Sequence, residues 1–335
     1  MFKRIQAAKA YLEHGDDLAG SLVPDDAVVV DAPPDAARPA IDAALDGRWE
    51  PAAELLRGTR EGRDWEERDV LVAALGRRAL DAPAWLDAWR EATRDDPDLA
   101  VVDARRLVEL AWQQRSNDDI STVSQEQVAA FHSTLEQATE RIQHSVDASP
   151  GDPVPWALAL RHARGTEADR AAFDGYLQAL GSTDPHHYGA RYEAMQYLCA
   201  KWFGSHEEMY DFARSSVEAA PREARVQSLL LDAVLEHLAA DASALTTDPD
   251  RVEEAIARAK GYLDANPDAG HHLTAQTRNV LARVLFHLER HREAYEQMQL
   301  IGPHATSYPW RYWDDARSEF LTHRTHIVTL AAGAT

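Results

Sequence analysis

The chain has 335 residues, of which 45% are hydrophobic, and this apolar content excludes a largely disordered protein. Its 56 acidic and 35 basic residues give a net charge of −21, and a field of that sign repels phosphate backbones and anionic lipid head groups. Nucleic acids and membrane surfaces are therefore not expected as partners. Cys199 is the single cysteine, so neither an intrachain disulfide nor a cysteine-based zinc site can form, which fits a reducing cytoplasm.

The N-terminal region, residues 1–115, is expected to be helical but irregular. Residues 22–35 (LVPDDAVVVDAPPD) are its one β-rich stretch, and the flanking prolines predict either an edge strand or, as we prefer, an extended linker. Helices are predicted over 36–46, 49–58, 65–80 and 84–95. The polar segment RSNDDISTVS at 115–124 is expected to separate this region from a second one over 124–335.

From about residue 100 onward, apolar residues recur with the i, i+3, i+4, i+7 spacing of amphipathic helices, as in the stripe over 128–146. Ser205 with Glu208, and Asp250 with Glu253, have the spacing of capping boxes and predict two helix starts. Prolines stand where the stripes stop, at 97, 150, 221 and 267, and predict helix ends. No comparable run of alternating residues is present, so the sequence predicts an all-α fold.

Three prolines share one register with earlier residues on the apolar stripes. Pro150, Pro221 and Pro267 each lie twelve residues after a small or flexible residue, in the order Ala138, Met209 and Ala255. Each of those earlier residues has a glutamate two positions before it, in EQA, EEM and EEA. Pro185 falls between the first two prolines and gives spacings of 35 and 36 residues, with Phe173 at the position of the small residue. The register therefore indicates a repeat.

This register resembles the tetratricopeptide repeat (TPR), a helix-turn-helix unit of 34 residues with a small residue early in its second helix and a proline after it. The stretch 279–298 resembles one unit best, with Leu281 and Ala282 in place of the Leu-Gly pair and Ala294 at the small position. Residues 47–56 (GRWEPAAELL) resemble the start of another second helix. The resemblance is to degenerate repeats over roughly 125–300.

The resemblance implies a right-handed solenoid of helical hairpins over 124–335, ending in a C-terminal capping helix. Stacked hairpins bury one another's faces and leave a concave surface. The function implied is a non-enzymatic scaffold or adaptor that docks a protein or peptide partner on that surface. The alternative fold is an irregular helical bundle with proline-terminated helices.

Two groups of residues are candidates for partner binding. The densest polar and aromatic cluster follows Pro185 and consists of His186, His187, Tyr188, Arg191, Tyr192 and Glu193. The second group lies in SYPWRYWDD (307–315), where Trp310, Arg311 and Trp313 form either an aromatic and arginine platform or a cap on the end of the helical array.

Histidines offer the only hint of catalytic or metal chemistry. His287 and His291 are four residues apart, a spacing that places two metal ligands on one helix face, but a site would need a third ligand from elsewhere. The sequence contains no HExxH, GxSxG or phosphate-binding glycine motif. The alternative function is thus an enzyme that uses this pair or the histidine and tyrosine cluster. No cofactor is expected, and a small-molecule ligand remains open.

Overall fold

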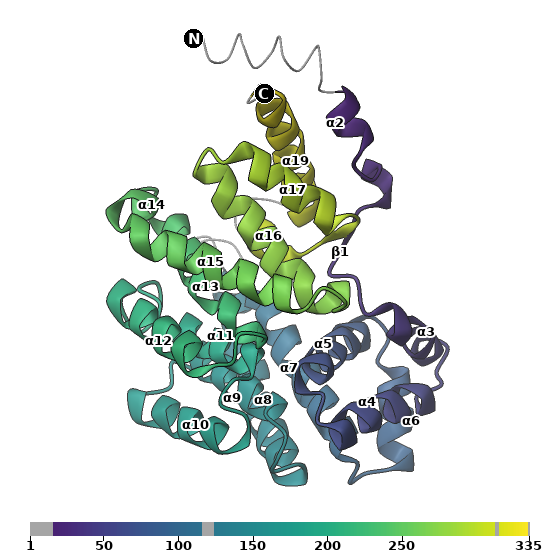
Figure 1. Cartoon of the computed structure of the whole chain (residues 1–335). Coiled ribbons are helices and arrows are strands. Elements are labelled where there is room, and N and C mark those ends of the chain that lie inside the picture. The colour runs from purple at the N-terminus through teal and green to yellow at the C-terminus, as the bar shows by residue number, and fades with distance from the viewer. Residues whose placement is uncertain (1–15, 116–123, 312–314, 334–335) are drawn as a thin grey trace. The chain divides into compact units, whose positions relative to one another are not determined.

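A computed structural model of the chain describes residues 16–115, 124–311 and 315–333. Within these residues it contains eighteen α-helices and two strands of two residues each (Figure 1). The predicted all-α class is confirmed, whereas the right-handed hairpin solenoid stays a prediction. A membrane crossing needs about 20 apolar residues in one helix, and none of the helices in the described ranges meets that requirement.

The chain divides into two compact units. The first, called the middle unit, is Pro33–Ala219, and the second, called the terminal unit, combines Met1–Ala32 with Ala220–Thr335. The boundary predicted at 115–124 falls within the sequence of the middle unit. Residues 116–123 of that boundary lie outside the described residues.

The middle unit is a stack of helices connected by short loops. Its elements are the 3₁₀ turn η3 (Asp35–Ala37), α3 (Arg38–Leu45), α4 (Glu50–Gly62), α5 (Trp65–Asp81), α6 (Ala84–Ala92), α7 (Pro97–Arg115), α8 (Gln125–Ala148), α9 (Val154–Gly165), α10 (Arg170–Thr183), α11 (Tyr188–Tyr197) and α12 (His206–Ala219). The four helices predicted before residue 100 are confirmed as α3 to α6. The fully buried Trp85 and Trp89 anchor the core beneath them.

Four helices of the middle unit, α5, α7, α9 and α11, pack in succession. Helix α5 packs on α7, α7 on α9, and α9 on α11, while α5 also touches α9 and α11. The apolar residues of α7, such as Val102 and Val108, are fully buried, but Arg105 and Glu109 of the same helix keep part of their surface exposed. The polar residues of these four helices therefore converge on each other, and they form the candidate site below.

The terminal unit joins an N-terminal segment to the C-terminal helices. It contains α2 (Asp16–Gly20), η2 (Asp25–Ala27), β1 (Val29–Val30), η4 (Arg225–Ser228), α13 (Leu229–Ala240), α14 (Ala244–Thr247), α15 (Pro249–Ala265), α16 (His271–His287), α17 (His291–Ile301), β2 (His304–Ala305), α18 (Ser307–Trp310) and α19 (Ala316–Ala332). Strand β1 pairs with β2 in parallel. Residues 22–35 were expected to form either an edge strand or, as preferred, an extended linker. The structure has a short strand there, at Val29–Val30.

Helix ends follow the local signals of the sequence. Pro150, Pro221 and Pro267 each stand two residues after the last residue of a helix, which confirms them as stops. Pro185 stands in the same place after α10. The stop predicted at Pro97 is wrong, because Pro97 is the first residue of α7, a position where its missing N–H costs nothing. At the start of α12 the backbone N–H of Glu208 donates to Ser205 Oγ at 3.1 Å, as predicted.

The predicted capping box at Asp250 and Glu253 is wrong. Helix α15 begins at Pro249, and its N-terminal cap is Asp248, whose side chain accepts from the backbone N–H of Arg251 at 3.0 Å. The reason is that Pro249 suits the first helical position, where its missing N–H costs nothing, so the cap moves to the residue before it.

Candidate functional site

The residues predicted from the segment after Pro185 do not act together. His187 is fully buried and caps α11, because its Nδ1 accepts the backbone N–H of Ala190 at 3.2 Å. The side chain of Tyr188 is also buried, and its backbone N–H donates to Glu66 of α5 at 2.7 Å. Both residues therefore fix the start of α11 rather than present a surface.

Arg191 and His186 likewise have local structural contacts. Arg191 donates from Nε to the Pro185 carbonyl at 2.7 Å and places its guanidinium over the Phe212 ring of α12 at 5.5 Å. Burial lowers the pKa of Arg191 below its ordinary value. The backbone N–H of His186 donates to Asp184 Oδ1 at 2.9 Å, which belongs to the turn before α11.

Tyr192 and Glu193 lead into a different set of residues. Arg164 of α9 forms an ion pair with Glu193 at 3.0 Å and lies 3.4 Å from the Gln196 side-chain oxygen. Gln196 in turn donates to the Tyr192 hydroxyl at 3.3 Å. These two predicted residues therefore belong to a chain of polar contacts that runs from α11 to α9.

That chain is one end of a charged group that we call the arginine cluster. Its members come from α5, α7, α9 and α11: Asp69, Arg105, Glu109, Arg161, Arg164 and Glu193. Their side chains are between 10% and 16% exposed, so they are largely desolvated but still reached by solvent. In such surroundings charge interactions are stronger than at an open surface.

Glu109 is the centre of the arginine cluster. Both of its carboxylate oxygens accept from Arg161, each at 3.2 Å, and Arg105 Nη2 approaches Oε1 to 2.5 Å. Burial opposes the charge on Glu109, but Arg161 and Arg105 outweigh it and hold its pKa well below the ordinary range. Glu109 is therefore ionised at neutral pH and orients two arginines at once.

A glycine lets α11 join the cluster. Asp69 of α5 lies 4.0 Å from Arg105 Nη1. A Cβ atom on Gly189, in the first turn of α11, would overlap Asp69 Oδ2, so only glycine allows this approach. Asp69 and Glu66 thus place two carboxylates at the N-terminus of α11, where the helix dipole favours negative charge.

Next to the arginine cluster two tryptophans and two arginines form what we call the tryptophan–arginine box: Trp112, Arg115, Arg164 and Trp202. The indole rings of Trp112 and Trp202 meet edge to face, with centroids 5.9 Å apart. Arg164 lies 4.9 Å from the Trp112 centroid and 5.4 Å from that of Trp202. Arg115 lies 5.8 Å and 5.5 Å from the same two rings.

Several donors of the cluster and the box are buried without a hydrogen-bond acceptor among the described residues. They are the Nε atoms of Arg105, Arg161 and Arg164 and the indole Nε1 atoms of Trp112 and Trp202. A buried donor left without an acceptor costs about 1–3 kcal/mol. Two acceptors of the cluster, Asp69 Oδ1 and Glu193 Oε2, also make no hydrogen bond there. The arrangement can therefore recover free energy by binding a group that brings both acceptors and donors.

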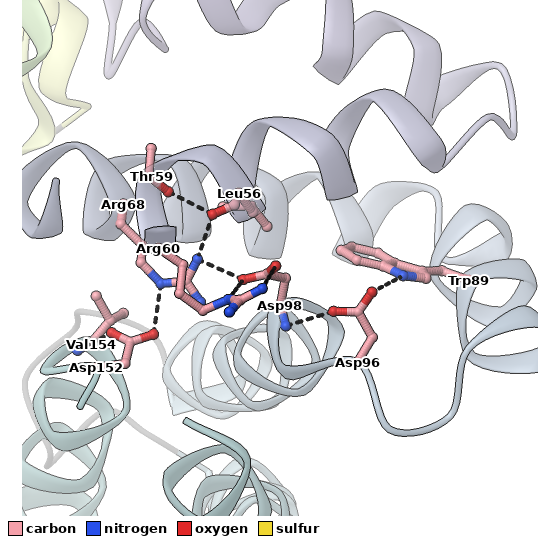
Figure 2. Close-up of polar contacts among 9 residues, drawn as sticks. All are labelled: Leu56, Thr59, Arg60, Arg68, Trp89, Asp96, Asp98, Asp152 and Val154. Carbon is pink, nitrogen blue, oxygen red and sulfur yellow. Dashed lines mark hydrogen bonds and ion pairs between the residues drawn. The ribbon is translucent and has the colours of Figure 1, made fainter. Parts of the chain in front are cut away.

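A second charged network in the middle unit serves a different purpose. Arg68 of α5 lies between Asp98 and Asp152, at 2.7 Å and 2.6 Å, and donates to the Leu56 carbonyl at 2.9 Å (Figure 2). Arg60 adds two hydrogen bonds to Asp98, at 3.1 and 3.2 Å. Because Arg68 and both acids are at most 2% exposed, no ligand reaches them, and the network joins α4, α5, α7 and the start of α9.

The C-terminal aromatic group is divided between core and surface. Trp310 is fully buried, donates from Nε1 to Asn279 Oδ1 at 2.7 Å, and meets the Phe320 ring edge to face. Arg311 is exposed. Trp313 lies outside the described residues. Trp310 therefore holds α16 against α19 and does not face a ligand.

The two histidines predicted as metal ligands flank a turn. His287 is the last residue of α16, and His291 is the first residue of α17. Within the described ranges, no three His, Cys, Asp or Glu side chains come together in a way that would hold a metal ion. The pair thus has no third ligand in that part of the chain.

Sequence reasoning missed most of the arginine cluster and the box. A signal for them exists in α7, where Arg105, Glu109 and Trp112 have the i, i+4, i+7 spacing of one helix face. The partners of that face, Arg161 and Arg164, come from α9 and are identified only by the packing of the two helices.

Comparison of the chain with protein-family models, with curated proteins and with solved structures finds no match.

Proposed function

We propose that the chain is a non-enzymatic scaffold that docks a segment of a partner protein on the surface formed by α5, α7, α9 and α11. The single observation that carries the proposal is the contrast in exposure between the two charged networks. Arg68, Asp98 and Asp152 are at most 2% exposed, whereas the side chains of the arginine cluster are 10–16% exposed. Charged groups that stay accessible at the junction of four helices suit recognition better than structural support.

The chemistry of the surface is that of protein recognition. Arginine and tryptophan are enriched at the energetic centres of protein interfaces, and here they occur together with Tyr192 and Gln196. The proposed docking surface takes the place of the concave face implied by the TPR resemblance. Packing of alternate helices in succession is what a helical-repeat architecture requires, and we retain the TPR type as part of this proposal.

The proposal places the protein in the cytoplasm. Its single cysteine, Cys199, is buried, and a chain with one cysteine forms no internal disulfide, which suits a reducing compartment. No observation favours the alternative of an enzyme, since His187 caps a helix and the described residues provide no metal-ligand trio.

Site-specific photo-crosslinking tests the docking surface. A benzophenone amino acid is introduced at Tyr192, and in a matched control at Gln178, which is exposed on α10. Both proteins are irradiated in a lysate of the source organism. We expect a discrete crosslinked partner from position 192 and not from position 178, and the crosslinked peptide identifies the bound segment. Equal patterns from the two positions would reject this surface.

A further inference from the structure

Residues 16–32 form a segment, which we call the strap, that is docked on the C-terminal helices of the terminal unit. The strap comprises α2, η2 and β1. At β1 the backbone N–H of Val29 donates to the Pro303 carbonyl at 2.8 Å. The backbone N–H of Asp31 donates to the Ala305 carbonyl of β2 at 3.0 Å. The strap is therefore held by residues that follow it far along the chain.

Two arginines of α19 bind the main chain of the strap. Arg317 donates to the backbone carbonyl of Asp25 at 2.6 Å and to that of Val28 at 3.2 Å. Arg324 donates to the Val23 carbonyl at 3.0 Å and pairs with the Asp25 carboxylate. Every residue has a backbone carbonyl. These bonds therefore recognise a chain path together with a single acid.

Side chains at both ends of the strap narrow this recognition. Near its start, Ser21 Oγ contacts the Tyr295 hydroxyl and accepts from Gln299 Nε2 at 3.2 Å. At its end, Asp31 accepts from the backbone N–H and the hydroxyl of Ser307, at 2.9 and 2.6 Å. We call the five residues that bind the strap the strap site: Tyr295, Gln299, Ser307, Arg317 and Arg324. The strap site thus requires a serine and two acids at fixed spacing.

The strap buries little apolar surface. Among residues 17–32, Val28 is the one buried side chain, and its neighbour Val29 is 49% exposed. Segments with few buried apolar contacts open at a lower free energy than the core. The strap is therefore able to leave the strap site while the helices of the terminal unit stay folded.

A stiff hinge follows the strap. The boundary between the two units lies between Ala32 and Pro33. Proline fixes its own φ and keeps the residue before it extended, and Pro34 has φ −51° and ψ 137°. Asp31 has a φ of 50°, in the left-handed region that residues other than glycine seldom adopt. The docked strap thus requires a sharp bend next to a stiff segment, and release of the strap removes that bend.

We propose that two copies of the chain exchange their straps, so that the strap of each copy binds the strap site of the other and a dimer forms. The contacts of the docked strap are all kept in this exchange, and only the hinge changes conformation, which makes exchange a low-cost route to a dimer. A second copy is the partner because it carries Ser21, Asp25 and Asp31 at the required spacing. The inference concerns the terminal unit and goes beyond the docking surface proposed on the middle unit.

The test places one cysteine on each side of the contact, in separate chains. Ser21→Cys and Gln299→Cys are produced together in one cell, with tags of different size, and the purified protein is treated with a short bifunctional maleimide. Both positions are exposed, whereas the native Cys199 is buried. In the matched control Ala257→Cys takes the place of Gln299→Cys, because Ala257 is exposed on α15 and the strap is bonded to α17, β2, α18 and α19.

We expect a crosslink between the two tagged chains from Ser21→Cys with Gln299→Cys, and none from the control pair. Light scattering of the wild type is expected to give twice the mass of one chain. The variant Pro33→Gly is expected to lower the dimer fraction, because a flexible hinge lets the strap return to the strap site of its own chain. Circular dichroism verifies that this variant is folded.

Each other outcome contradicts the exchange. A monomer without the crosslink between chains would overturn it, and so would a dimer in which position 299 crosslinks no more than position 257, because the copies would then associate through another surface. A foreign protein captured at position 299 would assign the strap site to a partner's segment instead. An unchanged dimer fraction in Pro33→Gly would contradict the role of the hinge. None of these results depends on crosslinking at position 192, so the proposed docking function is tested separately.

Discussion

Arg68 and Asp152 form an ion pair of 2.6 Å between Nε and Oδ2, and neither side chain is exposed to solvent. The pair joins α5 to the start of α9, where Asp152 Oδ1 also accepts the backbone N–H of Val154 at 2.9 Å. Helices α5 and α9 both contribute to the arginine cluster. The buried Arg68–Asp152 pair therefore positions two of the helices that carry the arginine cluster.

Replacing one partner of this pair is expected to be costly. Asp152→Asn leaves Arg68 with Asp98 as its one remaining buried acid, and loss of a partner from a buried pair costs on the order of 3 kcal/mol. The free energy of unfolding, measured by urea denaturation, checks this value. In the double variant Arg68→Met with Asp152→Leu, the free energy of unfolding is expected to fall by less than the sum of the two single changes. The reason is that no charge is then buried alone near position 152.

An exposed pair of the same unit provides the control. Arg170 and Asp174 are 50% and 60% exposed and lie 3.3 Å apart. Exposed pairs contribute little, so Arg170→Gln is expected to change the free energy of unfolding by less than about 1 kcal/mol. Equal losses in Asp152→Asn and Arg170→Gln would contradict the role given to the buried network.

Much of the fold was predictable because helix ends are set by local chemistry. Pro150, Pro221 and Ser205 act on the residues next to them, and their effect is visible in sequence alone. His187 shows the limit of such reasoning. Its neighbours made it a candidate for binding, but the same local signal, a side chain before a helix, makes it a cap.

The candidate site was less predictable because its residues meet only through tertiary packing. Arg164 and Trp112 are far apart in sequence, and nothing near either residue indicates the other. Asp69 reaches α11 because Gly189 has no side chain, a relationship that requires both helices to be in place. Spacing along one helix identifies a face, but it does not identify what that face contacts.

Gly189 offers a direct test of the approach between α5 and α11. In Gly189→Ala the added methyl group would overlap Asp69 Oδ2, so a helix or a buried side chain must shift. We expect a loss of about 1–3 kcal/mol in the free energy of unfolding. We also expect weaker binding at the arginine cluster, because Asp69 moves relative to Arg105.

Gly175 is the matched control for Gly189. It lies within α10, and a Cβ atom there meets no atom within 4 Å. Gly175→Ala is expected to stabilise the protein by roughly 0.5–1 kcal/mol, since alanine is the better helix former. A gain in stability for both variants would show that Asp69 does not lie against α11 in solution.

The pKa of His323 predicts how acid changes the stability of the terminal unit. Burial and the nearby Arg283 lower its pKa to about 4 from an ordinary value of 6.5. Between these values the unfolded chain takes up a proton that the folded protein does not bind. Stability is therefore fully present above pH 6.5 and decreases as the pH falls towards 4.

The variant His323→Gln isolates this contribution. Glutamine keeps an oxygen that can accept from Arg283, the present partner of His323 Nε2, but it does not titrate in this range. Thermal unfolding is measured from pH 7 to pH 4 for both proteins. We expect the wild type to lose more stability than the variant over this range, and parallel curves would contradict the assignment.

The repeat register is tested by its small residues. Ala138 and Ala255 are both fully buried, in α8 and α15 respectively, at the positions where the register requires close contact between helices. Ala138→Leu and Ala255→Leu are each expected to lower the free energy of unfolding by about 1–3 kcal/mol, because the closely packed helices leave no space for the added carbons. Ala129→Leu is the control, since Ala129 is exposed on α8. If neither buried variant lowers the midpoint of thermal unfolding relative to Ala129→Leu, close packing at the small positions is absent and the register has no structural meaning.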